Sequence, residues 1–150
     1  MTNLNQLIIK FDYEQNFRDD DFYVSNSNKH IFKLLNQWPK WGKNFLNIIG
    51  EKFSGKSHLV KIFIKKYKGI KLDANSLSEE SLKILKIHQN IIIENLKNKI
   101  DQKLFYSLLN IIDLDNKFII VTSEKPIVNI DLTLTDLKSS TKNFLLQKIE

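Results

Sequence analysis

The chain has 150 residues, which fits one domain, and 42% of them are hydrophobic, which is enough to bury a core. Its formal net charge of +6 comes almost entirely from lysines spread along the chain, so a weak contact with DNA stays open but charge alone does not establish one. Cysteine is absent, which excludes disulfides and cysteine-ligated zinc, and the three histidines lack metal-ligand spacing.

The N-terminal sequence and the length of the apolar runs bear on where the protein acts. No apolar run approaches the ~20 residues that a membrane span needs. The first residues, MTNLNQLIIKFDYEQ, lack the basic-then-apolar order of a secretory signal. We therefore expect a cytoplasmic protein without a membrane segment.

Hydrophobic periodicity predicts alternating helices and strands after an irregular segment over residues 1–25. A first helix is expected in SNSNKHIFKLLNQW, capped by Ser27 or Asn28 and ended by Pro39. The later elements are expected, in chain order, as a strand over 45–49, a helix over 57–67, a strand over 70–73, a helix over 75–86, a strand over 91–94, a helix over 101–112, and strands over 118–122 and 143–149.

This alternation predicts an α/β fold in which a parallel five-stranded sheet lies between helices. The strands are short, continuous apolar runs, which suits burial on both faces of the sheet. We expect an N-terminal extension over residues 1–25 and a core domain over residues 26–150.

The stretch GEKFSGKS, residues 50–57, fits the phosphate-loop pattern G-x-x-x-x-G-K-[ST]. Glycines allow the loop to direct N–H groups at phosphate oxygens, Lys56 would reach the β- and γ-phosphates, and the Ser57 hydroxyl would ligate Mg²⁺. A chance match is expected in roughly one such chain in several hundred, and here a predicted strand precedes the loop and a helix follows it. We expect ADP or ATP to be bound by Gly50, Glu51, Lys52, Phe53, Ser54, Gly55, Lys56, Ser57 and His58.

Two later strand ends carry polar residues that such a site would use. Glu94 ends the strand in NIIIENL and is expected to hold Mg²⁺ through water, although a solvated strand end is the alternative. The next residue is Asn95, which cannot act as a base at neutral pH. Thr122 and Ser123 close a further strand, where they either sense the γ-phosphate or form a simple turn.

Several motifs together resemble one family, the DnaA-related regulators of replication called Hda and HdaA. The similar stretches are DDFYVSNSN, LLNQWPKW, GEKFSGKSHL, LFYSLLN, FIIVTSEKP and TDLKSS, and they span roughly residues 5–149. The resemblance implies a P-loop NTPase fold, a five-stranded AAA+ core followed by a helical lid. The given sequence stops where that lid would begin, so we expect either a truncated form or a protein in which the lid is absent. Arg18 is the only arginine, and the arginine of the family's lid has no counterpart.

The resemblance also implies an activity and partners. Family members bind the DNA polymerase sliding clamp, meet ATP-loaded DnaA and trigger its hydrolysis. The segment QLIIKF resembles the clamp-docking motif, in which Gln6 would hydrogen-bond at the rim while Leu7, Ile9 and Phe11 fill an apolar pocket. An edge strand that packs on the domain is the alternative for this segment.

Two further segments are compared with the family. Phe22 and Tyr23 lie in the segment DFYV, which matches the adenine pocket of the family, with core packing of Phe22 as the alternative. Ser140 stands in DLKSST where the family has the arginine that acts on the partner's nucleotide. Such an arginine can be worth ~10³–10⁵ in rate, and serine cannot supply its charge.

We therefore expect a regulator of replication initiation that holds ADP or ATP with weak or absent hydrolysis, since Asn95 and Ser140 replace catalytic groups. Alternatives are an active AAA+ ATPase of the helicase-loader type, a P-loop kinase of small molecules, and an adaptor that binds no nucleotide. The kinase alternative lacks the usual arginine after the phosphate loop, because Arg18 precedes it.

Overall fold

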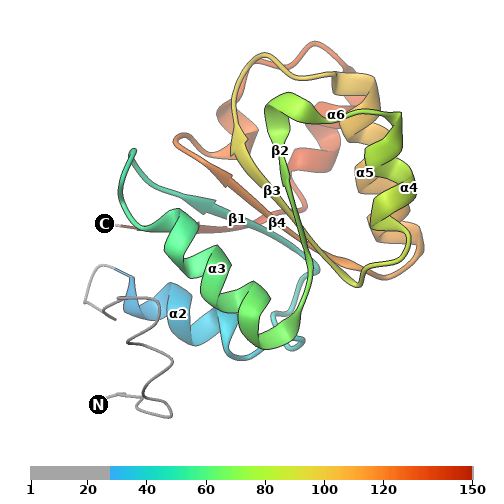
Figure 1. Ribbon diagram of the computed structural model, residues 1–150. Coiled ribbons are helices and arrows are strands. Elements are labelled where there is room, and N and C mark those ends of the chain that lie inside the picture. The colour runs from blue at the N-terminus through green and yellow to red at the C-terminus, as the bar shows by residue number, and fades with distance from the viewer. Residues whose placement is uncertain (1–27, 150) are drawn as a thin grey trace.

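Five parallel strands form one sheet in the computed structural model, which describes residues 28–149 (Figure 1). The strands lie in the order β2-β3-β4-β1-β5, and every neighbouring pair is parallel. Their bounds are Phe45–Ile49 for β1, Ile70–Asp73 for β2, Asn90–Leu96 for β3, Phe118–Ser123 for β4 and Leu145–Lys148 for β5. The predicted α/β class and the five-stranded parallel sheet are confirmed.

A helix lies between each pair of successive strands, as parallel pairing requires, and one more helix precedes the first strand. Their bounds are Lys29–Leu35 for α2, Lys56–Tyr67 for α3, Glu79–Leu85 for α4, Gln102–Leu114 for α5 and Thr135–Thr141 for α6, with short 3₁₀ turns η1 at Ala74–Ser76 and η2 at Ile127–Asn129. The sequence reading missed α6 and η2, because both are short and lack a clear apolar period.

One predicted helix, over residues 75–86, is divided in two. The Asp73 carboxylate accepts a hydrogen bond from the Asn75 N–H at 2.8 Å, which favours a tight 3₁₀ turn directly after β2. Leu77 is extended, and α4 then begins after Ser78, whose N–H donates to the Ser81 hydroxyl at 3.0 Å. Side chains that bond the local backbone therefore interrupt the helix that the apolar spacing predicts.

The two faces of the sheet are covered by different helices, with α2 and α3 on one side and α4, α5 and α6 on the other (Figure 1). Successive strand residues serve the two sides in turn: Ile91 and Ile93 pack with Phe105 of α5, whereas Ile92 packs with Phe63 of α3. Burial on both faces explains why the strands read as continuous apolar runs.

Parallel strands bring all their carboxyl ends to one edge of the sheet, where open α/β folds place ligands. The loop after β1, the last residues of β3 and the end of β4 therefore meet there. None of the helices within residues 28–149 is long and apolar enough to cross a membrane.

Candidate functional site

The loop over residues 50–55 joins β1 to α3 and is anchored to β4, because the Gly50 N–H donates to the Ser123 carbonyl at 3.2 Å. A Cβ on Gly50 would lie 2.6 Å from Ser54 Oγ, so a side chain at this position would force Ser54 to move. Gly55 precedes α3 with φ 105°, a left-handed conformation that favours glycine. Gly50 of the predicted phosphate loop thus lies where the loop comes close to itself, and Gly55 lies at a left-handed turn.

Lys56, the first residue of α3, turns back over this loop. Its ammonium donates to the Gly50 carbonyl, to the Glu51 carbonyl at 2.9 Å and to Ser54 Oγ at 3.5 Å. Burial lowers the pKa of Lys56 below its ordinary value, while the carboxylates of Glu124 and Glu94 act in the opposite direction. A half-buried cation therefore lies at the centre of the loop.

Phe53 lies in the same loop with φ 62°, and the residue is fully exposed. A left-handed backbone is unfavourable for a bulky residue, and the ring gains nothing from packing within residues 28–149. The loop therefore carries a strained and fully exposed aromatic residue, next in sequence to Lys52, and both residues line the pocket described below.

Glu94 of β3 reaches the start of α3. The Ser57 hydroxyl donates to Glu94 Oε1 at 3.1 Å, and Glu94 Oε2 is buried without a hydrogen bond. The ammonium of Lys71, from β2, lies 3.6 Å from this second oxygen, within ion-pairing distance but beyond a hydrogen bond. A serine hydroxyl beside a carboxylate is a donor set that suits Mg²⁺, so these residues fit the predicted metal.

The backbone after Glu94 departs from regular strand geometry. Asn95 has φ 65°, and the register of β3 against β4 shifts between Ile93 and Leu96. The Asn95 N–H donates to Thr122 Oγ1 at 3.1 Å, and its side-chain amide donates to Asp73 Oδ2 at 3.3 Å. This bulge turns Asn95 away from the ladder and joins the ends of β2, β3 and β4.

Ser123, at the end of β4, is held by a buried asparagine that the sequence reading passed over. Asn47 of β1 donates to Ser123 Oγ at 3.1 Å and to the Val121 carbonyl at 3.0 Å, and its oxygen accepts from the Ile127 N–H at 2.8 Å. Ser123 Oγ in turn donates to the Lys125 carbonyl at 2.6 Å. A polar residue inside the apolar run FLNII was the available signal for this network.

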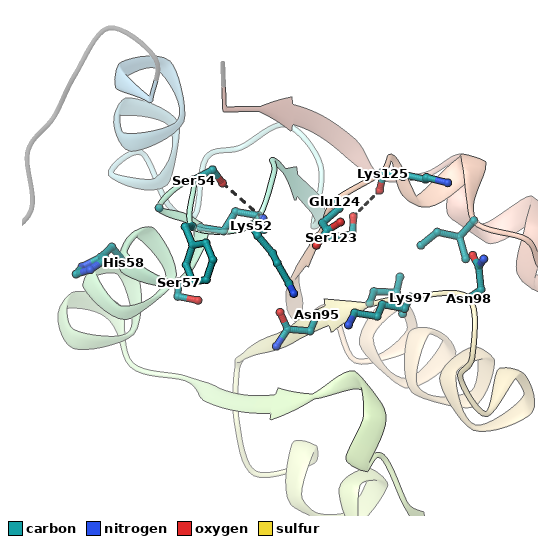
Figure 2. Close-up of a pocket in the computed structure, with 15 residues that line it drawn as sticks. Lys52, Ser54, Ser57, His58, Asn95, Lys97, Asn98, Ser123, Glu124 and Lys125 are labelled. Carbon is teal, nitrogen blue, oxygen red and sulfur yellow. Dashed lines mark hydrogen bonds between the residues drawn. The ribbon is translucent and has the colours of Figure 1, made fainter.

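These elements surround a pocket of about 870 Å³ (Figure 2). Its lining combines loop residues 52–58 with Asn95, Leu96, Lys97, Asn98, Ser123, Glu124, Lys125 and Ile130. Four lysines and a single carboxylate line it, so the pocket is positively charged at neutral pH and suits a polyphosphate. Lys97 and Lys125 were not predicted, because each follows a strand end without any motif to mark it.

The predicted site residues separate into four groups. Residues 52–58 and Ser123 line the pocket together, while Glu94 and Thr122 lie buried behind it and contact Ser57 and Asn95. Gly50 and Glu51 contact Lys56 through their carbonyls. Phe22, Tyr23 and the segment from Gln6 to Phe11 lie outside the described residues, so their roles stay predictions.

Comparison with known proteins identifies the fold. No protein-family model and no curated protein matches the chain. Among solved structures, AMPPCP-bound DnaA from Aquifex aeolicus matches with a TM-score of 0.73 and 21% identity, covering 87% of this chain and 49% of that one. Domain III of DnaA from Thermotoga maritima matches with a TM-score of 0.71 and 17% identity, covering 96% and 69%. The chain therefore has the fold of an AAA+ P-loop core.

The DnaA structures with this fold are of a replication initiation protein. Besides DnaA, a structure of DnaI matches with a TM-score of 0.67 and 12% identity, covering 86% of this chain and 85% of that one. The chain spans about half the length of the AMPPCP-bound DnaA chain that it matches. At these identities the likeness concerns the fold.

Proposed function

We propose that this protein is a nucleotide-binding regulator of replication initiation, similar to the Hda group, which holds ADP or ATP with weak or absent hydrolysis. The observation that carries the proposal is the phosphate loop itself, with Lys56 folded over two loop carbonyls at the carboxyl end of β1. These carbonyls would give up Lys56 to the phosphates, which are stronger acceptors because they are charged.

The residues that would hold Mg²⁺ are Ser57 directly and Glu94 through water. Bound there, the metal would neutralise phosphate charge. The buried Glu94 Oε2 supports this assignment, because it accepts no hydrogen bond and has only the Lys71 ammonium at 3.6 Å, so it keeps the capacity to bind a cation or a water held by one.

We expect weak hydrolysis because the side chain that follows Glu94, near the proposed phosphate site, cannot act as a base. Asn95 occupies the position after Glu94 and uses its amide to reach Asp73, so it offers no base for an attacking water. Thr122 accepts the Asn95 N–H, and Ser123 donates to the Lys125 carbonyl. The hydroxyls at the end of β4 are therefore engaged in holding the backbone, although either could exchange partners when a nucleotide binds.

Action on DnaA by the usual arginine route is weakened by Ser140. Its hydroxyl donates to the Asp136 carbonyl one turn earlier in α6, at 3.1 Å, and carries no charge. We propose that the protein docks on the sliding clamp through Gln6, Leu7, Ile9 and Phe11. We also propose that it still contacts DnaA, to regulate it rather than to activate ATP hydrolysis by DnaA efficiently. Binding to immobilised clamp, lost in a Leu7→Ala and Phe11→Ala double variant, would test the docking motif.

The first test of the proposal is thermal unfolding with and without ADP-Mg and ATP-Mg. A ligand that binds only the folded state stabilises it by about 2.7 kcal/mol at one hundred times Kd. We expect a clear upward shift that Lys56→Ala removes. Lys61→Ala is the matched control, because Lys61 is an exposed lysine of the same helix outside the pocket. No shift with either nucleotide would refute nucleotide binding.

The helicase-loader alternative stays open, because a structure described as a candidate primosome component has the same fold over 87% of this chain and 84% of that one. This alternative requires steady-state ATP hydrolysis. Hydrolysis at a rate well above that of Lys56→Ala would favour it, and equal rates would favour the regulator.

A further inference from the structure

Lys71 introduces a positive charge beside Glu94. It lies on β2, an edge strand of the sheet, and β2 pairs with β3 so that Asp73 faces Glu94 and Lys71 faces Ile92. Ile92 packs toward α3, so by strand alternation Lys71 and Glu94 project from the same face of the sheet. Pairing and alternation thus bring the ammonium to 3.6 Å from Glu94 Oε2.

This contact differs from an ordinary surface ion pair because one of the two partners, Glu94, is buried. The Lys71 side chain is 53% exposed, whereas the Glu94 side chain is 10% exposed. The other carboxylate oxygen already accepts from Ser57, so Lys71 supplies the positive charge nearest to the buried oxygen among the contacts of the described residues. A charge interaction with a buried carboxylate is screened less than one between two exposed groups.

Glu94 is also the residue proposed to hold Mg²⁺. A divalent cation held near Glu94 and the Lys71 ammonium would repel each other and would share one carboxylate. Because Lys71 is half exposed, it can move aside, so the metal is disfavoured rather than excluded. Conversely, when no metal is bound, the Lys71 ammonium already neutralises part of the charge of the Glu94 carboxylate. Glu94 therefore repels the phosphates of a nucleotide less.

We propose that Lys71 is a built-in counter-cation for Glu94, so that nucleotide binds this protein with little dependence on Mg²⁺. The inference rests on the proposed function, since it concerns the same phosphate loop. The added residue is Lys71 of the edge strand β2, which no sequence motif marks. In this proposal Lys71 determines how strongly nucleotide binding depends on Mg²⁺.

The test measures the Kd of ADP by calorimetry, once with Mg²⁺ and once with EDTA, for the whole chain. For the wild type we expect the two values to agree within about twofold, and for Lys71→Met we expect EDTA to weaken binding about fivefold relative to Mg²⁺. Methionine keeps a flexible stem of similar length and removes only the charge. Lys61→Met, on the exposed side of α3, is the matched control and should behave as wild type.

A second readout needs no nucleotide. Mn²⁺ titrated into the protein is followed by the paramagnetic resonance of the free ion, and Lys71→Met is expected to bind Mn²⁺ more tightly than the wild type. If Lys71→Met does not fold, Lys71→Gln replaces it in both measurements.

The outcomes separate the two proposals. Absence of ADP binding in both Mg²⁺ and EDTA refutes the proposed function and with it this inference. Strong Mg²⁺ dependence in the wild type, or equal metal dependence in wild type and Lys71→Met, overturns the role of Lys71 and leaves the phosphate loop intact.

Discussion

At each end of the sheet a lysine donates hydrogen bonds to backbone carbonyls, but the two lysines connect different parts of the chain. At the amino end, Lys117 is 7% exposed and donates to the Lys86 and His88 carbonyls at 3.2 and 2.7 Å. At the carboxyl end, Lys56 is half-buried and donates to carbonyls of its own loop. The first lysine ties segments about thirty residues apart, and the second closes only a local turn.

The difference indicates which end stabilises the domain. Lys117 donates to the carbonyl of Lys86, the C-cap residue of α4, and to the carbonyl of His88 in the turn that follows the helix. Near it, Asn44 donates to Asn116 and Gln89 donates to the Asn116 carbonyl, so that the loops at this end are joined.

At the carboxyl end the buried group without a hydrogen bond is a carboxylate oxygen, that of Glu94, whereas at the amino end the neutral amide oxygen of Asn90 lacks one. A buried carboxylate oxygen without a hydrogen bond, together with the left-handed and exposed Phe53, is typical of a site kept for a ligand.

The largest expected contrast comes from glycine substitutions at the two ends. In Gly69→Ala the new Cβ would lie 2.9 Å from the Asn90 carbonyl oxygen, at φ 155°, so we expect a loss of about 3 kcal/mol in the free energy of unfolding. In Gly50→Ala the nearest atom is Ser54 Oγ, which can rotate away, so we expect about 1 kcal/mol. Urea unfolding of both variants measures the contrast. A larger loss for Gly50→Ala would reverse the roles assigned to the two ends.

The two lysines provide the next contrast. Lys117→Met leaves two carbonyls of the amino end without their donor and is expected to cost about 2 kcal/mol, whereas Lys56→Met is expected to cost less than about 1 kcal/mol because water reaches its loop. Chemical denaturation gives both values, and ADP-dependent stabilisation is then measured for each. It should persist in Lys117→Met and disappear in Lys56→Met, so equal nucleotide responses would contradict the comparison.

The smallest expected effect concerns left-handed residues. Phe53→Gly removes the strain of φ 62° from an exposed residue and is expected to raise the free energy of unfolding by about 1 kcal/mol. Asn116 is also left-handed, with φ 55°, but asparagine tolerates this conformation and its side chain accepts from Asn44. Asn116→Gly should therefore bring no gain. Thermal unfolding distinguishes the two, and a gain at Asn116 alone would show that strain is not concentrated at the phosphate loop.

Much of the fold could be predicted because its signals are local. Apolar runs such as FLNII and FIIV mark buried strands, and the spacing of glycines, Lys56 and Ser57 marks the loop within eight residues. The missed elements were those governed by short-range hydrogen bonds, such as the turn at Asp73 that divides a predicted helix. In α6 only Leu137 and Thr141 are buried, which is too little for an apolar period to show.

The sequence by itself therefore determined the class of fold and the place of the phosphate loop, since both depend on residues close together in the chain. Tertiary structure alone decided the strand order, which places β1 between β4 and β5 and β2 beside β3. From that order come the Asn47 network, whose partners lie 74 to 80 residues away, and the contact of Lys71 with Glu94. No local pattern encodes such contacts, because they depend on which strands become neighbours and on the face to which each side chain points.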